Sequence, residues 1–295
     1  MKHQIATLFL LSAILLSASC RLSDRPQGKL MGGIREYEGA SEEATGSEKA
    51  SVEKEDRKRM EGSKNVSADD GLETPAPLTQ RDEQILKRLA YTSSYNATWR
   101  IPNWVAWRLD ADETTGPYKR AGIKFQEDYD VPTPRAVDWD YARSGYDRGH
   151  LCPSGDNKWN RQAQEESFLF TNICPQSHQL NTGDWNELEV KCRTWAKRYG
   201  SVYIVTGPIV GNPPYKMIGR NRVVVPSAFF KVVLRMGDNP QALAFVYENE
   251  DGSRPMSHYL STVDEVEEIT GIDFFPSLVD DIEVKVEAES NWDNW

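Results

Sequence analysis

A long polar segment near the start of the chain limits where a folded domain can lie. Residues 21–80 are rich in Glu, Lys, Ser and Gly, carry almost no aromatic residue, and end in Thr-Pro-Ala-Pro at 74–77. Such a segment cannot bury enough apolar surface to offset the entropy that it would lose on ordering. We therefore expect residues 21–80 to form a flexible tether, and the hydrophobic core to come from the residues that follow.

The first twenty residues have the order of a bacterial secretory signal. Lys2 precedes an apolar run at 5–16, and three small residues lead to Cys20. The run is too short to span a membrane. Small residues before a cysteine are typical of a lipoprotein processing site, although Ser17 stands where leucine would make the pattern stronger. We expect residues 1–20 to be a signal peptide of an exported protein, either lipid-anchored to the cell envelope at Cys20 or simply cleaved and periplasmic or secreted.

Residues 81–279 have the pattern of one folded domain. Length alone would allow two domains, but the polar N-terminal third leaves material for one. Apolar alternation or apolar runs predict strands at 104–109, 168–173, 202–205, 223–225, 229–234 and 242–247, with a short extended piece at 121–125. Helical spacing predicts a short turn at 163–168, one continuous helix at 181–198, and a last helix from 261 or 262 to Gly271. The expected fold class is a mixed α/β (α+β) fold around a central, mainly antiparallel sheet, followed by a loose acidic tail at 280–295.

The charge and the cysteines exclude some classes of site. A net charge of −10 argues against a broadly basic surface, so nucleic acid would have to bind through a local patch, a metal ion, or both. Cys152, Cys174 and Cys192 lack zinc-ribbon spacing. We expect them to be small buried residues that form at most one disulfide, whose pairing the sequence does not indicate.

Residues 147–198 concentrate chemically different side chains. His150 could be a general base near neutral pH, although an isolated histidine is more often structural. On one helix, Asn181 and Glu189 would share a side two turns apart, yet Asn181 could equally be a helix cap. Glu189 and Arg193 could form an ordinary helical ion pair, and Asn172 could be a turn residue.

Several ordered motifs in this region resemble the DNA/RNA non-specific endonucleases, a family that includes secreted bacterial sugar-non-specific nucleases and mitochondrial endonuclease G. They are Asp-Arg-Gly-His at 147–150, Thr-Asn-Ile-Cys-Pro-Gln at 171–176, and Leu-Asn-Thr-Gly-Asp-Trp-Asn-Glu-Leu-Glu at 180–189, followed by Arg193. The resemblance continues through 203–208 and 225–231 to 271–276. It covers nearly all of residues 85–277.

The resemblance implies a ββα-metal (His-Me finger) nuclease fold. It also implies Mg²⁺, or Mn²⁺, as cofactor, and hydrolysis of DNA and RNA. In-line attack by a water that the histidine deprotonates would leave 5′-phosphate ends. Carried over residue by residue, His150 is the general base, Asn181 the direct metal ligand, and Glu189 the residue that orients a metal-bound water. Asn172 would hold the base or the metal waters in place.

The resemblance also implies cationic groups that bind phosphate. Arg148 and Arg193 would neutralise phosphate charge, and an arginine upstream of the histidine motif would assist. Arg120 is the candidate for it and Arg108 the competitor. A local basic track could include further residues, each of which could equally be an ordinary surface charge: Lys158, Arg161, Lys197, Arg198, Lys216, Arg220 and Arg222.

Two other functions are compatible with the sequence. One is a nucleic-acid-binding module that keeps the fold without turnover, although binding alone needs no general base. The other is a phosphodiesterase for small or lipid phosphates, held near its substrate by Cys20. The sequence does not indicate the oligomeric state.

Overall fold

The computed structural model describes residues 71–250, 252 and 254–295. The expected signal peptide, Cys20 and residues 21–70 of the expected tether lie outside these residues. All described residues belong to one compact unit, Glu53–Trp295. A membrane-crossing helix, which must be long and apolar, does not occur among them.

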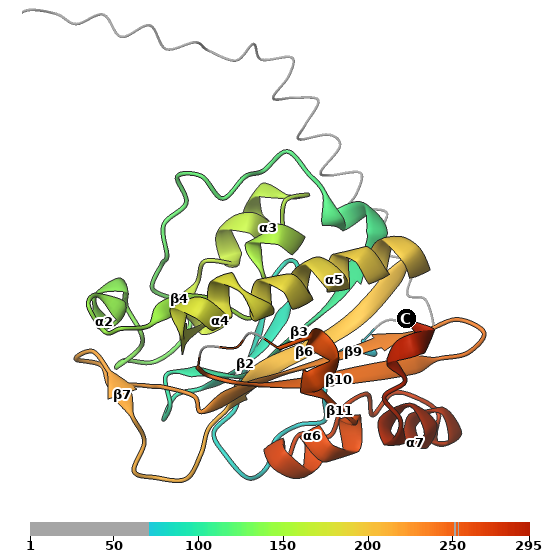
Figure 1. Ribbon diagram of the computed structural model, residues 1–295. Coiled ribbons are helices and arrows are strands. Elements are labelled where there is room, and N and C mark those ends of the chain that lie inside the picture. Colours follow the sequence, from blue (N-terminus) through green and yellow to red (C-terminus); the bar gives the residue numbers. More distant parts are fainter. Residues whose placement is uncertain (1–70, 251, 253) are drawn as a thin grey trace, which may run out of the picture. The chain divides into compact units, whose positions relative to one another are not determined.

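A seven-stranded sheet forms the centre of the described unit (Figure 1). Its strand order is β1-β2-β3-β6-β9-β10-β11, and every neighbouring pair is antiparallel, which confirms the predicted mixed α/β fold with an antiparallel sheet. The strands are β1 (Gln84–Lys87), β2 (Thr92–Asn96), β3 (Ile101–Asp110), β6 (Ser201–Ile209), β9 (Ala228–Arg235), β10 (Gln241–Glu248) and β11 (Leu260–Ser261). The middle strands are apolar along nearly their whole length because both faces of the sheet are covered.

Helices cover the two faces. In β3, Val105, Trp107 and Leu109 belong to the core that contains helix α5 (Asp184–Tyr199). The alternate residues Trp104 and Ala106 belong to a second core, which contains residues of α6 (Val263–Thr270) and α7 (Asp280–Ala288). Because successive strand side chains point to opposite faces, the sheet lies between α5 on one side and α6 and α7 on the other (Figure 1).

Short elements complete the fold on the α5 side. Strand β4 (Asp147–His150) pairs with β5 (Ile173–Gln176), and β7 (Met217–Ile218) pairs with β8 (Val223–Val224). The short helices are α2 (Asp138–Tyr141), α3 (Arg161–Glu166) and α4 (His178–Thr182), with single turns η1 (Ala111–Thr114), η2 (Ser154–Asp156), η3 (Phe170–Asn172), η4 (Met256–Tyr259) and η5 (Trp292–Asn294). The two-stranded β4–β5 sheet followed by α4 and α5 gives the predicted ββα order.

The single helix predicted at 181–198 is wrong. The chain breaks at Gly183, with φ −104° and ψ −111°, so Asn181 lies on α4 and Glu189 on α5. Ser177 caps α4 through the backbone N–H of Leu180, whereas α5 has no side-chain cap. A Cβ atom at Gly183 would lie 2.6 Å from the Gln179 carbonyl oxygen, so glycine permits this tight connection. The apolar spacing is continuous across the break because both helices pack on the same core.

Two other local predictions fail and one succeeds. Residues 121–125 form no strand, and 168–173 form turn η3 before β5 instead of one strand; a single bridge joins Gln126 to Leu169 there. Helix α6 begins and ends as predicted: Thr262 caps it with Glu265, and Gly271 closes it at φ 65°.

The polar ends of the domain are more ordered than composition suggested. Residues 280–295, expected to be loose, form α7 and η5, and the Trp295 ring lies 4.9 Å from the Trp195 ring of α5. At the other end, Leu72 is only 4% exposed and packs into the core under α6 and α7, so the folded part begins before residue 81. One or more apolar side chains, Trp295 in one segment and Leu72 in the other, pack each segment against the core.

The three cysteines of the described part are free and buried. Cys152 follows β4, Cys174 lies on β5 opposite Gly149, and Cys192 lies on α5. Burial raises the thiol pKa of each, that of Cys192 to about 12. They are small core residues, as expected.

Candidate active site

A cleft of about 720 Å³ opens where β4, α4 and α5 meet the loops at 116–120 and 153–158. Seven of the nine predicted site residues line it: Arg120, Arg148, His150, Lys158, Asn181, Glu189 and Arg193. They come from separate parts of the sequence, so the fold assembles the site.

The β4–β5 pair places His150. His150 is paired with Ile173, and Gly149 with Cys174. A Cβ atom at Gly149 would lie 2.4 Å from the side-chain oxygen of Gln176, so glycine lets the two strands approach closely. The imidazole lies between aromatic rings, 5.3 Å from the centroid of Phe125 and 4.9 Å from that of Phe168.

His150 is held in its neutral form. Its Nε2 atom is buried and has no hydrogen-bond partner among the described residues. Burial, assisted by the positive charge of Arg120, lowers the pKa of His150 to about 3. A neutral imidazole at pH 7 can accept a proton.

Asn181 is fixed by Asp147. The Asn181 amide nitrogen donates to the Asp147 carboxylate at 2.9 Å, and His178 contacts the same carboxylate oxygen at 2.9 Å. A carboxylate can only accept from the amide NH₂ group, so this bond sets the orientation of the amide. It leaves the amide oxygen, a ligand atom suited to a hard divalent cation, for another partner.

Glu189 lies in a charged but partly desolvated setting on α5. Burial raises the pKa of Glu189 to about 7, and the negative charge of Asp156 acts in the same direction. The positive charges of Lys231, Arg193 and Arg120 oppose this shift. Lys231 itself is buried, with its ammonium 4.5 Å from the Trp185 ring centroid. A carboxyl group in this setting titrates near neutral pH in the absence of a bound cation.

Two arginines are anchored by acidic side chains. Arg193 donates to Asp156 at 2.7 Å, and the Asp156 side chain is only 1% exposed. Arg148 donates to Asp138 of α2 at 2.7 Å. Each anchor fixes one edge of a guanidinium group, which has five donors, so the others can bind an anion in the cleft.

Of the two arginines considered upstream of the histidine motif, Arg120 lines the cleft and Arg108 does not. Arg120 lies over the Phe168 ring, whereas Arg108 pairs with Asp110 at 3.0 Å and lies over Tyr203. Lys158 lines the cleft and Arg161 does not; Arg161 stacks on Tyr118. The other residues of the suggested basic track are also absent from the lining: Lys197, Arg198, Lys216, Arg220 and Arg222.

Asn172 lies in the core next to the site, outside the cleft lining. It is fully buried, donates to the carbonyls of Cys152 and Ser167 at 2.8 Å, and accepts from the Cys152 N–H at 2.9 Å. These bonds hold the chain immediately after His150. The turn that Asn172 occupies therefore braces the segment that carries the imidazole.

Sequence reasoning missed several residues of the site. Asp147 was visible in the motif but received no role, and Asp156 and Lys231 were not connected to Glu189. Lys119 and Asn186 also line the cleft. Asp156 lies 37 residues before Arg193, so only the folded chain shows their contact.

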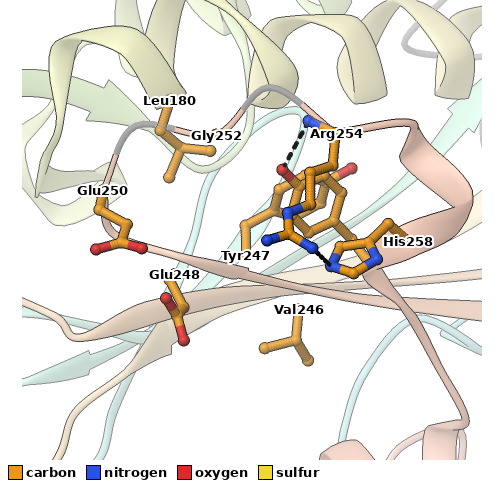
Figure 2. A pocket seen from close by; sticks show the side chains of 9 residues that line it. Leu180, Val246, Tyr247, Glu248, Glu250, Gly252, Arg254 and His258 are labelled. Atoms are coloured by element: carbon orange, nitrogen blue, oxygen red, sulfur yellow. Dashed lines mark hydrogen bonds between the residues drawn. The ribbon is translucent and has the colours of Figure 1, made fainter.

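A second pocket, of about 570 Å³, lies beside β10 (Figure 2). Figure 2 shows Arg254 and His258 side by side, with their nitrogen atoms 3.0 Å apart. The Tyr247 and Tyr259 rings stack at 4.0 Å. None of the predicted site residues lines this pocket.

The sequence of the folded part matches a known protein family. Residues 69–281 match the family model described as DNA/RNA non-specific endonuclease. The chain belongs to this family. All seven of the predicted residues that line the cleft lie within the part that matches the endonuclease family.

Relatives and a solved structure support the family assignment. The mitochondrial nuclease EXOG of Danio rerio is 36% identical over 201 residues, which are 63% of this chain and 59% of that protein. Nuclease C1 of Cunninghamella echinulata var. echinulata is 35% identical over 218 residues, 68% of this chain and 86% of that protein. A crystal structure of the EndoG/EndoGI complex, on the mechanism of EndoG inhibition, matches with a TM-score of 0.65 and 29% identity, covering 67% of this chain and 87% of that one. The match to the Danio rerio relative thus spans less than two thirds of that protein.

Proposed function

We propose that this protein is a Mg²⁺-dependent, sequence-non-specific endonuclease that hydrolyses phosphodiester bonds of DNA and RNA to leave 5′-phosphate ends. The observation that carries the proposal is the cleft, in which a neutral imidazole, an oriented amide and anchored arginines line the same space. Family membership supports the reaction class.

The donor set of the cleft fits a hard divalent cation. The Asn181 amide oxygen is left available by the bond to Asp147, and Glu189 lines the same cleft. Mg²⁺ prefers oxygen ligands and keeps several of its waters, so one amide ligand leaves most of its charge for the substrate. When bound there, Mg²⁺ or Mn²⁺ would supply Lewis-acid stabilisation of the negative charge that develops on phosphate.

The protein side chains divide the remaining work. His150 lines the cleft, and its imidazole, which burial keeps neutral, accepts the proton of the attacking water. Arg193 and Arg148 stabilise the charge on the pentacoordinate phosphorus with the donors that their acidic anchors leave over. Glu189 orients water on the α5 side of the cleft. In-line attack breaks the bond between phosphorus and the 3′ oxygen, which takes up a proton from water in the cleft, and the phosphate stays on the 5′ end.

The same arrangement explains the lack of specificity. The proposed groups address phosphate, the metal ion or the attacking water, and none is assigned to a base edge. None is assigned to a 2′-hydroxyl, so DNA and RNA are both substrates.

A plasmid nicking assay tests the proposal. Wild-type protein should nick supercoiled plasmid with Mg²⁺ and stop with EDTA, and His150→Ala should lower the rate by roughly 10²–10⁴-fold because the general base is lost. His258→Ala is the matched control, since His258 lies in the second pocket. Cleavage by His150→Ala at the wild-type rate would contradict the role of His150 as general base. Products with 3′-phosphate ends would exclude this direction of attack.

The same preparation separates the other two functions. A binding module without turnover would bind plasmid and leave it intact with Mg²⁺. A phosphodiesterase for small or lipid phosphates would hydrolyse bis-p-nitrophenyl phosphate at least as well as polymeric DNA. We expect strong preference for the polymer, because Lys119, Arg120 and Lys158 extend the cationic lining of the cleft.

We propose further that the protein is exported and acts at the bacterial cell envelope, held by a lipid at Cys20. The support is the sequence of residues 1–20 alone. Membrane partition of wild-type protein and of Cys20→Ala, expressed in a bacterial host, tests this. Equal partition of the two would remove the anchor.

A further inference from the structure

Three acidic side chains meet between α6 and α7, on the sheet face opposite α5. Asp264 and Glu267 lie three residues apart on one side of α6, and Glu287 lies near the end of α7. One carboxylate oxygen from each residue lies within 4.8 Å of the other two. The cleft is lined by none of them.

Glu287 provides a second, independent observation. It is only 8% exposed, and its Oε1 atom is buried with no hydrogen-bond partner among the described residues. A buried carboxylate oxygen without a partner is unfavourable, because it loses water and gains nothing in exchange. A ligand that binds this oxygen would remove that cost.

No ion pair neutralises these three carboxyl groups in the described part of the chain. Lys285, on the same helix as Glu287, donates instead to Asn239. Burial, and the nearby acidic groups, raise the pKa of Glu267 to about 7 and that of Glu287 to about 8.

The three oxygens are close enough together to bind one Ca²⁺ ion. Ca²⁺ binds oxygen at ~2.3–2.6 Å, so two of its ligands lie at most ~4.6–5.2 Å apart. The three oxygens all lie within 4.8 Å of one another, and carboxylates are the ligands that Ca²⁺ takes in proteins. Water can complete its six to eight ligands, because Asp264 is exposed.

We propose that Asp264, Glu267 and Glu287 form a Ca²⁺ site that clamps α7 to α6. Glu287 lies beyond residue 281, where the match to the endonuclease family ends. The site belongs to the C-terminal part of this chain and is separate from the cleft. With three carboxylates and a partly exposed position, its Kd should be on the order of 10⁻⁴–10⁻³ M.

Thermal unfolding and calorimetric titration with Ca²⁺ test the proposal on the full chain. At ten times the Kd, Ca²⁺ should raise the wild-type Tm by roughly 3–6 °C. Glu267→Gln/Glu287→Gln should abolish this shift and remove one bound Ca²⁺. In EDTA above pH 8, where both carboxyl groups of wild type are ionised, the Tm of this variant should be no lower than that of wild type, because repulsion is relieved. Glu268→Gln, an exposed change on the same helix, should behave as wild type.

Two further variants keep the result decisive. Asp264→Asn changes an exposed residue and should fold normally while weakening Ca²⁺ binding about tenfold. Asn181→Ala removes the proposed cleft ligand and should leave the α6–α7 site intact, so the outcome does not depend on the nuclease mechanism. Absence of a Ca²⁺ shift in wild type, or an equal shift in Glu267→Gln/Glu287→Gln, would overturn the proposal and leave a proton-sharing cluster as the explanation.

Discussion

At the scale of single residues, Asp147 determines the orientation of the proposed metal ligand. Its carboxylate accepts from the Asn181 amide and contacts His178, and it lies three residues before His150. One side chain therefore connects the strand that carries the proposed base to the helix that carries the proposed ligand. Residues of this kind tune metal affinity without touching the metal.

Replacing Asp147 should weaken metal binding more than it weakens catalysis. In Asp147→Ala the Asn181 amide can rotate, so the Mg²⁺ concentration for half-maximal nicking should rise by about 10–100-fold. The rate at saturating Mg²⁺ should change much less. His178→Ala is the control, because it removes the other contact of Asp147 and leaves the amide bond in place. A lower rate with unchanged Mg²⁺ dependence would contradict this role.

In metal-free protein, the contributions of His150 and Glu189 to the free energy of unfolding should change with pH in opposite directions. The folded pKa of His150, about 3, lies below its ordinary 6.5, so its contribution to stability is lost as pH falls below 6.5. The folded pKa of Glu189, about 7, lies above its ordinary 4.5, so its contribution is lost as pH rises above 4.5. Between pH 4.5 and 6.5 the two trends oppose each other.

Single substitutions should separate these trends. In EDTA, from pH 4.5 to 6.5, the unfolding free energy of Glu189→Gln should rise relative to that of His150→Gln by about 2 kcal/mol or more. Urea unfolding of both variants at several pH values in this interval measures it. Other titrating groups, Asp156 among them, are present in both variants and cancel in the difference. Parallel curves would show that burial does not shift these pKa values in solution.

The sequence motifs predict the residues of the cleft but not the side chains that contact them. The motifs contained His150, Asn181 and Glu189, and the fold brings them to one cleft. The partners that set their properties are not predictable from spacing, since Asp147 is 34 residues before Asn181 and Asp156 is 37 before Arg193. Asn172 was predicted to act on the base or the metal waters, and the structure places it in a backbone brace.

At the scale of elements, the break between α4 and α5 positions the two halves of the site. A continuous helix would have fixed Asn181 and Glu189 two turns apart on one surface. The backbone at Gly183 gives α4 its own direction, so Asn181 can reach Asp147 on β4. The apolar periodicity could not predict this break, because it records the shared core and not the backbone angle.

Gly183→Ala should damage stability and metal binding together. The added methyl group would lie 2.6 Å from the Gln179 carbonyl oxygen, so α4 must shift, at a cost of about 1–3 kcal/mol. Urea unfolding and the Mg²⁺ dependence of nicking measure the two effects. Gly211→Ala is the control, because its nearest contact would be 3.8 Å away, at the Ser227 hydroxyl. Wild-type behaviour of Gly183→Ala would mean that the connection tolerates an ordinary helix.

At the scale of the whole molecule, a net charge of −10 coexists with a cationic cleft. The overall field repels nucleic acid, and the local charges of the cleft attract it. Substrate binding should therefore depend steeply on salt. Removing positive charge from the cleft should also weaken binding more than removing the same charge from elsewhere on the surface.

Removing two cleft lysines should reduce that salt dependence. For Lys119→Gln/Lys158→Gln, the slope of log K for duplex DNA against log salt should become shallower by roughly 2 units. Binding to an uncleaved duplex in EDTA, by fluorescence anisotropy at several salt concentrations, gives the slope. Lys87→Gln/Lys197→Gln removes the same charge from exposed positions outside the cleft and should preserve the slope. Equal effects of the two pairs would mean that net charge, and not the cleft, governs binding.

The three buried thiols have a further consequence at this scale. Cys152, Cys174 and Cys192 lie beside the site strand, within its partner strand and on α5, and burial raises the pKa of each. Because alkylating reagents attack only an exposed thiolate, each cysteine reacts only when its own element opens. Mass spectrometry of timed alkylation would then report separately how often the β4–β5 pair and the α5 helix open, using chemistry that the chain already carries.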